Sequence, residues 1–399
     1  MVNLIAQIVF WFSAAALFYI YVGYPVLVYL VSLAFPKKID RAAFAPQVTI
    51  LITAYNEENA IRAKLENTFA IDYPKEKLEI LVASDGSTDK TDAIVKEFAS
   101  KGVRLFRQEG RVGKTVTQNN AVERASGEII LFSDATTDYK PDVLREILPN
   151  FADASIGCVA GKLVYVDSSA SNVGKGAQKY WNYETFLKES ESRACSLIGA
   201  SGCLYAVRKS AYRPMYAEAC SDFLICTVLY EQGLRSVYEP RAVCTEDTNR
   251  QTDKEMRMRV RVISQTFTDL WRNRKMLNPL RSGFYAIELL SHKVLRYAVP
   301  LILLLIFVAN AVLMVYSFFF EIVFLAQIGF YLLVFIGWAF EKMGTKIGVF
   351  ALPHYFVLAN LASAVGFYKF LRGERYATWE PIREKNEEPE AVSTFNQTV

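Results

Sequence analysis

The chain has 399 residues, of which 52% are hydrophobic, and its 45 basic and 41 acidic residues leave a formal net charge of +4. This length allows one sizeable domain plus additional segments, and the small net charge without a clustered basic surface argues against a nucleic-acid partner. Six cysteines without a CxxC spacing and only two histidines argue against a zinc site and leave acid–base chemistry to carboxylates.

Hydrophobic residues are concentrated at the two ends of the chain. Residues 1–36 carry no charge, and residues 297–370 carry very little. The first stretch exceeds the roughly 20 residues that span a bilayer, and it lacks the basic start and cleavage region of a signal peptide. It therefore predicts a retained transmembrane helix. The residues just after it are basic, which by the positive-inside rule places the following body in the cytoplasm: Lys37, Lys38 and Arg41.

Between the two apolar ends, short buried strands alternate with helices. Strands are expected at 48–52, 78–83, 103–107 and 128–134, and a polar helix is expected from Gly113-Lys114 to Arg124. This alternation predicts a parallel, doubly wound α/β sheet. Clusters of Asp, Asn and Thr follow the strands, at the edge where such sheets bind ligands.

Asp134 ends the 128–134 strand. A carboxylate at that position can hold Mg²⁺ or Mn²⁺ together with substrate phosphates. The alternative is an aspartate that only caps the following turn.

An amphipathic helix is expected over residues 254–272, because apolar residues recur there at helical spacing. Arg257 and Arg261 lie together on its flank at i, i+4 spacing. Since the helix precedes the membrane segments, it is expected to rest at the membrane interface. The apolar stripe consists of Met256, Val260, Ile263, Phe267 and Leu270.

Three apolar segments near the end, about 297–320, 322–340 and 347–368, predict a second membrane region. One N-terminal span plus these three would put the basic tail that begins at Lys369 outside, against the positive-inside rule. We therefore expect one segment to be re-entrant or interfacial, with the segment containing Pro353 as the candidate.

Five motifs occur in one order: Thr53–Glu58 (TAYNEE), Ser84–Asp89 (SDGSTD), Gly113-Lys114 with Asn119, Ser133–Thr136 (SDAT) and Ser221-Asp222-Phe223. The series resembles the family 2 glycosyltransferases with a GT-A fold, in the membrane-embedded branch of cellulose, hyaluronan and poly-N-acetylglucosamine synthases. The resemblance covers about residues 46–275, and the tail motif Trp379–Arg383 looks like that branch too.

The resemblance implies a Rossmann-like GT-A domain with a mixed sheet in the cytosol and transmembrane helices at both ends. The expected divisions are a transmembrane helix at 1–36, the GT-A domain at 37–253, interfacial helices at 254–296, the C-terminal transmembrane region at 297–370 and a polar tail at 371–399.

The resemblance also implies a role for each matched residue. Asp222 would be the catalytic base, and Asp134 would bind the metal, although Thr136 replaces the second acid of the family's DxD motif. Thr245–Asp247 looks like the family's Thr-Glu-Asp motif but comes too late in the chain. The UDP-sugar contacts would be Ala54, Tyr55, Glu57, Asp85, Lys114, Asn119, Arg257 and Arg261, and the acceptor side would include Gly199, Ser201 and Glu246.

Two of these roles have structural alternatives. Asp85 could instead form an Asx-turn in its Gly-Ser-Thr loop. The arginines could instead contact lipid headgroups.

These expectations describe a multi-pass inner-membrane enzyme that is an inverting glycosyltransferase. With Mg²⁺ or Mn²⁺ as cofactor, it would move a sugar from a UDP-sugar to a lipid-linked or glycan acceptor in exopolysaccharide or cell-envelope synthesis. Membrane lipids would surround it, and a homo-oligomer or an export partner is possible. Around Arg257–Arg261 the Gln and Trp of the processive relatives are missing, which favours a non-processive enzyme.

Three alternatives remain at this point. The first is a processive polysaccharide synthase. The second is a non-catalytic membrane scaffold that keeps a degenerate nucleotide-sugar domain. The third, a nucleotide-binding oxidoreductase, is disfavoured because no G-x-G-x-x-G follows the first strand.

Overall fold

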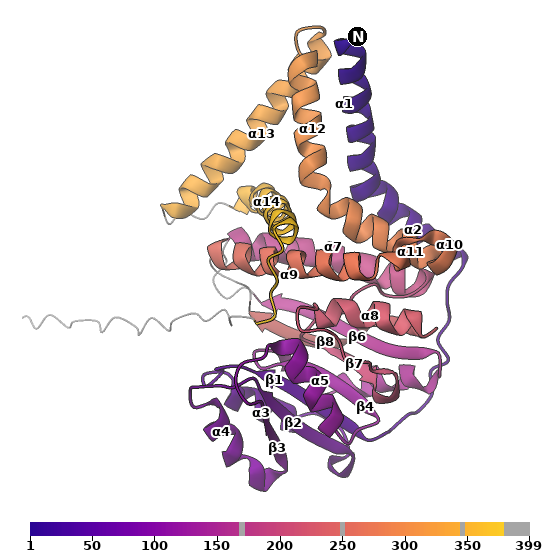
Figure 1. Ribbon diagram of the computed structural model, residues 1–399, viewed down its shortest axis with the longest axis vertical. Helices are drawn as coiled ribbons and strands as arrows, with labels where there is room; N and C mark the ends of the chain where they lie inside the picture. Colours follow the sequence, from indigo (N-terminus) through magenta and orange to yellow (C-terminus); the bar gives the residue numbers. More distant parts are fainter. Residues whose placement is uncertain (167–171, 248–251, 344–347, 379–399) are drawn as a thin grey trace, which may run out of the picture.

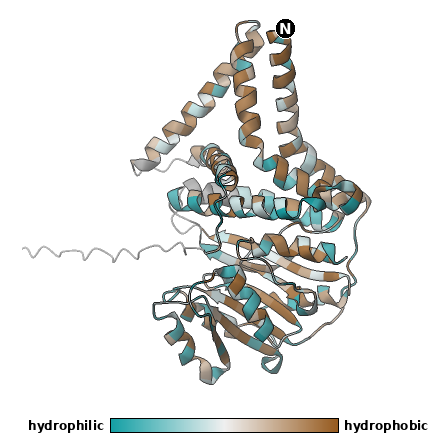
Figure 2. Cartoon of the chain, in the orientation of Figure 1, coloured by the Kyte–Doolittle hydropathy of each residue, from teal (hydrophilic) through white to brown (hydrophobic). Residues whose placement is uncertain are grey.

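The computed structural model describes residues 1–166, 172–247, 252–343 and 348–378. An α/β body forms one end of the molecule, and long apolar helices project from the other (Figures 1 and 2). The tail motif Trp379–Arg383, expected from the sequence, lies outside the described residues.

The body is built on one eight-stranded sheet in the order β3-β2-β1-β4-β7-β6-β8-β5. Strands β3, β2, β1 and β4 are parallel, which confirms the predicted doubly wound half. Strand β7 runs antiparallel to β4 and β6, so the sheet is mixed. The strands are β1 Val48–Ala54, β2 Leu78–Ser84, β3 Val103–Arg107, β4 Ile129–Asp134, β5 Asp138–Tyr139, β6 Ile156–Val166, β7 Tyr205–Arg208 and β8 Arg235–Asp247.

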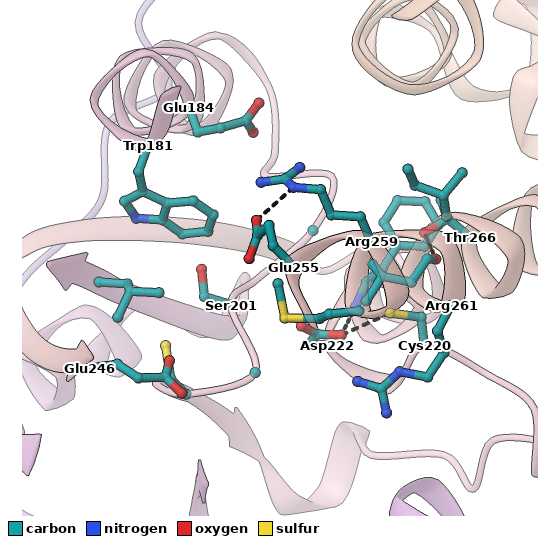
Figure 3. A pocket seen from close by; sticks show the side chains of 18 of the residues that line it. Trp181, Glu184, Ser201, Cys220, Asp222, Glu246, Glu255, Arg259, Arg261 and Thr266 are labelled. Atoms are coloured by element: carbon teal, nitrogen blue, oxygen red, sulfur yellow. Dashed lines mark hydrogen bonds and ion pairs between the residues drawn. The ribbon is translucent and has the colours of Figure 1, made fainter. Parts of the chain in front are cut away.

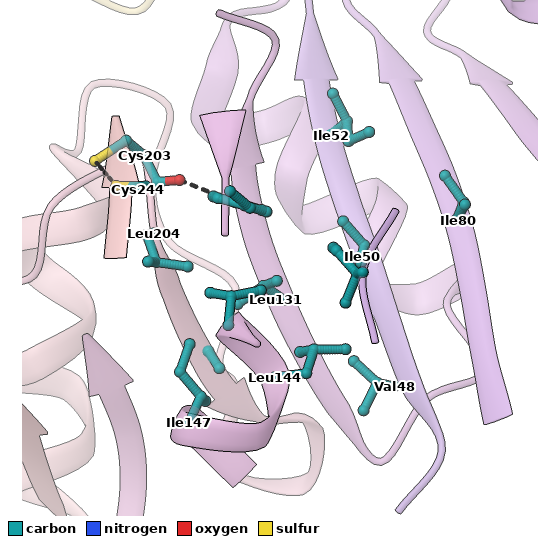
Figure 4. Close-up of a cluster of buried hydrophobic side chains, with 14 of the residues drawn as sticks. Val48, Ile50, Ile52, Ile80, Leu131, Leu144, Ile147, Cys203, Leu204 and Cys244 are labelled. Atoms are coloured by element: carbon teal, nitrogen blue, oxygen red, sulfur yellow. Dashed lines mark hydrogen bonds between the residues drawn. The ribbon is translucent and has the colours of Figure 1, made fainter. Parts of the chain in front are cut away.

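Both faces of the sheet are buried, as the continuous apolar runs of its strands require. Val48, Ile50 and Ile52 point into one core, which Figure 4 shows together with Leu144. Leu51, between them in the strand, points into the core on the other face. The helices of the body are α3 Ile61–Phe69, α4 Thr91–Glu97, α5 Lys114–Arg124, α6 Val143–Ile147 and α8 Ser221–Glu231.

A second helical layer separates the sheet from the membrane helices (Figure 1). It consists of α7, Asn172–Ala194, and α9, Thr252–Arg272, with α14, Ala351–Leu371, lying across them. The predicted apolar stripe of α9 is buried or half-buried along its length, and its Val260 and Ile263 pack against Ala362 of α14. This contact is close, because a Cβ atom added at Gly366 would lie 2.9 Å from Ile263. The stripe therefore faces another helix of the chain.

In the part of the chain that the structure describes, two helices are long and apolar enough to cross a membrane, Val2–Ala34 and Phe318–Phe340. A third crossing exists if Phe284–Leu295 and Val299–Leu313, bent by 58°, form one span. Among the residues described, α14 does not meet this criterion of length and apolarity. The expectation that the segment with Pro353 is re-entrant or interfacial stays a prediction. The elements involved are α1 Val2–Phe18, the π-helix η1 Tyr19–Gly23, α2 Tyr24–Ala34, α11 Phe284–Leu289, the π-helix η7 Leu290–Leu295, α12 Val299–Leu313 and α13 Phe318–Lys342.

The remaining elements are short connections. They are α10 Pro279–Ser282 and the 3₁₀ turns η2 Lys75–Lys77, η3 Ala99–Lys101, η4 Leu148–Ala152, η5 Lys209–Ala211, η6 Arg274–Leu277 and η8 Gly348–Phe350.

After α14 the chain returns toward the sheet. The side-chain amide of Gln265 in α9 donates to the backbone carbonyl of Tyr376 at 2.8 Å. The next carbonyl, that of Ala377, lies so close to Gly113 that a Cβ atom there would collide with it. Gly113 has a φ of +98° and immediately precedes α5, so residues 376–378 connect the α14 layer with the start of α5.

Candidate active site

A cavity of about 2560 Å³ lies at the carboxyl ends of β1 and β4, between the sheet and the helices above it. It extends from these strand ends to α14 and α13. Figure 3 shows part of its wall, where side chains from α7, α8 and α9 face one another. Eight residues predicted from the sequence line it: Glu57, Lys114, Asp134, Gly199, Ser201, Asp222, Glu246 and Arg261.

Three charged side chains converge beside Gly202. A Cβ atom added there would lie 3.2 Å from Oδ2 of Asp222, 3.3 Å from Nζ of Lys114 and 3.6 Å from Oδ2 of Asp134. Lys114 and Asp134 form an ion pair. Burial lowers the pKa of Lys114, but the nearby carboxylates outweigh it, so that its pKa is raised and the lysine stays charged. The absence of a side chain at Gly202 allows two carboxylates and one ammonium group to approach one another there.

We expect Gly202→Ala to slow turnover on the order of tenfold or more, because a methyl group would displace Asp222 and Lys114 by a few tenths of an ångström from positions that catalysis requires. Initial rates of nucleotide release measure the effect. The control is Gly329→Ala in α13, where an added Cβ atom meets nothing within 4 Å. Equal rates for the two variants would show that the space beside Gly202 is not used.

Asp222 stands in the first turn of α8, where the helix dipole favours a negative charge. Its Oδ1 accepts from the backbone N–H of Phe223 and from the Cys220 thiol, both at 3.1 Å. Its backbone carbonyl accepts from the N–H of Ala200 at 2.9 Å. These contacts fix the carboxylate against the turn at Gly199–Gly202, and they leave Oδ2 directed at the space beside Gly202.

Asp269 of α9 supports this arrangement, and the sequence analysis did not single it out. Its carboxylate accepts hydrogen bonds from the Tyr216 hydroxyl and, at 3.1 Å, from the backbone N–H of Cys220. Burial raises the pKa of Asp269 to about 8, even though both hydrogen bonds oppose the rise. Asp269 therefore positions the segment that leads into Asp222.

Glu246 and Thr136 meet across the same edge of the sheet. Glu246 is near the end of β8, and its Oε1 accepts from the Thr136 hydroxyl at 3.2 Å. Burial raises the pKa of Glu246 to about 7, and the negative charge of Asp134 contributes to the rise. The threonine that replaces the second acid of the motif is thus bonded to a carboxyl group from another strand.

Two of the four arginines on α9 line the cavity. Arg261 lines it, as expected, and so does Arg259, which the sequence analysis left out and which pairs with Glu255 at 2.7 Å. Arg257 is exposed and does not line the cavity; its Nε donates to the backbone carbonyl of Asp253 at 3.3 Å. The i, i+4 spacing correctly placed Arg257 and Arg261 on one flank of the helix, but of these two only Arg261 reaches the cavity.

Four other predicted UDP-sugar contacts do not line the cavity. Asp85 is fully buried and accepts from the backbone N–H groups of Val112 and Gly113 and from the Thr117 hydroxyl. These hydrogen bonds hold the start of α5, and they differ from the Asx-turn alternative, which would involve the Gly86-Ser87-Thr88 loop. Asn119 bonds Met215 and Tyr212.

The other two of the four lie at the end of β1. Ala54 is buried there, and the guanidinium of Arg111 stacks 4.1 Å from the ring centre of Tyr55.

The oxygen donors at this site suit a hard divalent cation. Asp134 borders the space beside Gly202, and the Thr136 hydroxyl and the Glu246 carboxyl line the same cavity. No group of three or more His, Cys, Asp and Glu that could hold a metal occurs within the described parts of the chain. Such a sparse set fits Mg²⁺ or Mn²⁺, which share their coordination shell with substrate phosphates and water.

The fold defines a structural class. A mixed sheet of this order, with an acidic strand end at a deep cavity, is a GT-A-like fold. A mannosyltransferase of Pyrobaculum calidifontis, solved with GDP-mannose and Mn²⁺, superposes with a TM-score of 0.72 at 21% identity, covering 94% of this chain and 100% of its own. The agreement extends through the apolar helices, since nearly the whole chain is covered.

Residues 49–215 match the family model of glycosyl transferase family 2. The chain is 29% identical over 205 residues to the poly-β-1,6-N-acetyl-D-glucosamine synthase of Staphylococcus aureus (strain MSSA476), covering 49% of each chain. It is 33% identical over 140 residues to the probable glycosyltransferase YdaM of Bacillus subtilis (strain 168), covering 34% of this chain and 33% of that one. The matches thus span about half the length of the synthase and a third of YdaM.

Proposed function

We propose that this protein is an inverting glycosyltransferase that moves a sugar from a UDP-sugar to a membrane-bound acceptor in exopolysaccharide or cell-envelope synthesis. The observation that carries the proposal is the convergence of Asp134, Lys114 and Asp222 beside Gly202, in a cavity that extends from the sheet edge to α14 and α13. A donor diphosphate and an acceptor can meet there.

In the proposed reaction, Asp222 takes the proton from an acceptor hydroxyl. The freed oxygen forms a bond to the anomeric carbon, and the bond from that carbon to the diphosphate oxygen breaks, so that UDP leaves with the electron pair. Lys114 and Arg261 offset the negative charge on the leaving group. A divalent cation held by Asp134, when bound, would add to this charge neutralisation.

The side of the membrane follows from the charges. Lys37, Lys38 and Arg41 come directly after the Val2–Ala34 helix, and the positive-inside rule puts them in the cytoplasm. We propose a multi-pass protein of the inner membrane whose sheet and cavity lie on the cytoplasmic side, where nucleotide sugars are made.

Release of nucleoside diphosphate from purified protein in lipid nanodiscs tests the function. We expect UDP release from UDP-glucose or UDP-N-acetylglucosamine with Mn²⁺ or Mg²⁺, and loss of release after chelation. GDP-mannose serves as the competing donor. If nucleoside diphosphate is released only from GDP-mannose, the proposed donor is wrong and a GDP-sugar takes its place. If none is released from any donor, the non-catalytic scaffold is favoured.

We further propose that a single chain adds one or a few sugars and leaves export to an oligomer or another protein. The described residues hold two candidate spans, or three with the bent pair, which are few for a closed polysaccharide channel, and sugar in hydrocarbon is costly to solvate. Radiolabelled product should therefore migrate as short species on gels. A ladder that reaches high-molecular-weight polymer without partner proteins would establish the processive alternative.

A further inference from the structure

Gln118 of α5 is fully buried, and its side-chain amide joins two sides of the candidate site. Its Oε1 accepts from the Ser221 hydroxyl at 2.8 Å, and its Nε2 donates to the Thr53 hydroxyl at 3.3 Å. Because all three side chains are buried, the loss of one partner would leave a buried polar group unsatisfied. The amide of Gln118 therefore fixes the distance between the two hydroxyl groups.

The Ser221 end of this bridge lies at the proposed base. Ser221 directly precedes Asp222 in the first turn of α8, and both residues line the cavity. The bond to Gln118 thus fastens the backbone that carries the Asp222 carboxylate to the middle of α5. A second contact between the two segments comes from Thr115, whose hydroxyl donates to the Ala219 carbonyl at 2.8 Å. Helix α5 therefore holds this segment at two points.

The Thr53 end of the bridge lies at the edge of the sheet where the metal is expected. Thr53 is near the end of β1 and also lines the cavity. In the parallel pair of β1 and β4, Thr53 is the register partner of Asp134. The side chain of Gln118 therefore connects the strand pair that carries Asp134 with the helix turn that carries Asp222.

The third charged group of the site belongs to the same helix as Gln118. Lys114 is the first residue of α5, four positions before Gln118, so the two side chains lie on one face of the helix. The groups that converge beside Gly202 are the side chains of Lys114, Asp134 and Asp222. Each of them stands on a backbone segment that contains Gln118 or lies next to one of its hydrogen-bond partners.

We propose, on the basis of the function proposed above, that Gln118 is a positioning residue that sets the spacing between Asp222 and the donor diphosphate. In-line displacement requires the attacking oxygen and the leaving oxygen to lie at fixed places on either side of the anomeric carbon. Asp222 would orient the first oxygen, and Lys114 would contact the diphosphate that carries the second. Gln118 itself does not line the cavity, so it acts through its neighbours.

Gln118→Met tests this role, because it keeps the length of the side chain and removes both hydrogen bonds. In nanodiscs, it should lower kcat on the order of tenfold, since a small displacement of the base is costly, and it should leave KM for the UDP-sugar unchanged. Calorimetric binding of UDP with Mn²⁺ should also be unchanged, whereas a general loosening of the fold would weaken it. Gln118→Glu keeps an oxygen for the Ser221 hydroxyl and should recover most of the turnover.

Ser221→Ala removes the same hydrogen bond from its other end. Its kcat should fall to a similar extent, and the double variant should be no slower than Gln118→Met, because the shared contact can be lost only once. Losses that multiply in the double variant would show that the two residues act independently, and the proposal would be wrong. If Gln118→Met does not fold, kcat of Ser221→Ala decides alone.

Gln232→Met is the matched control. Gln232 caps the other end of α8, outside the cavity, and its Nε2 donates to the carbonyls of Ala211 and Val228, both at 3.0 Å. Its replacement should leave kcat unchanged. Wild-type kcat in Gln118→Met and Ser221→Ala, measured beside an active unmodified protein, would overturn the positioning role and leave the function standing. An unmodified protein that turns over no donor would overturn both.

Discussion

Replacing Asp222 with Asn should reduce turnover on the order of 100-fold or more, because the amide keeps the shape of the carboxylate but cannot accept the acceptor's proton. The contacts to Phe223 and Ala200 involve groups that the variant retains, so the fold around α8 should persist. Initial rates with saturating donor and acceptor, together with an unchanged melting temperature, measure the effect.

Asp247→Asn is the matched control for this prediction. Asp247 also lines the cavity, at the exposed end of β8, and it belongs to the acidic motif that competed for the role of base. Its replacement should have a much milder effect. If Asp247→Asn is the more severe of the two, the base has been assigned to the wrong carboxylate.

Asp134→Ala should abolish metal-dependent turnover, since it removes the carboxylate that borders the space beside Gly202. Calorimetric titration of Mn²⁺ in the presence of UDP provides a readout that does not depend on activity, and the heat of binding should disappear. The ion pair with Lys114 is lost as well, so the melting temperature should be measured alongside.

The control here is Asp138→Ala, four residues further along. Asp138 is exposed in the two-residue strand β5 and pairs with Thr245 of β8. The Asp138→Ala variant should retain metal-dependent activity. Wild-type turnover of Asp134→Ala with Mg²⁺ or Mn²⁺ would contradict the metal assignment.

The sequence predicted the parallel half of the sheet well, because strands such as β1 and β4 are buried on both faces and end abruptly in polar clusters. It did not place β6 and β8, since their pairing depends on partners far apart in the chain, with Ile156 next to Arg235. Local periodicity carries no information about such a contact. The helix α7, which forms one wall of the cavity, was not anticipated either.

For the site, too, the sequence predicted the residues that belong to local motifs and missed those placed by contacts between distant segments. Asp134, Lys114 and Asp222 come from motifs at element ends, and the structure brings them together. The sequence correctly placed Asp85 at the carboxyl edge of the sheet, but its carboxylate accepts hydrogen bonds from the backbone N–H groups of residues 112 and 113. Asp269 belongs to no motif, and only the packing of α9 against the body gives it a role.

The return of the chain after α14 brings residues 376–378 against two parts of the cavity wall. Residues 376–378 are fastened to α9 through Gln265 and abut Gly113 at the start of α5. A lateral movement of α14 that admits a bulky amphiphile from the bilayer is expected to displace residues 376–378 as well. These residues end beside Lys114. We therefore expect acceptor binding to affect binding of the donor diphosphate through a few backbone atoms, without a rearrangement of the sheet.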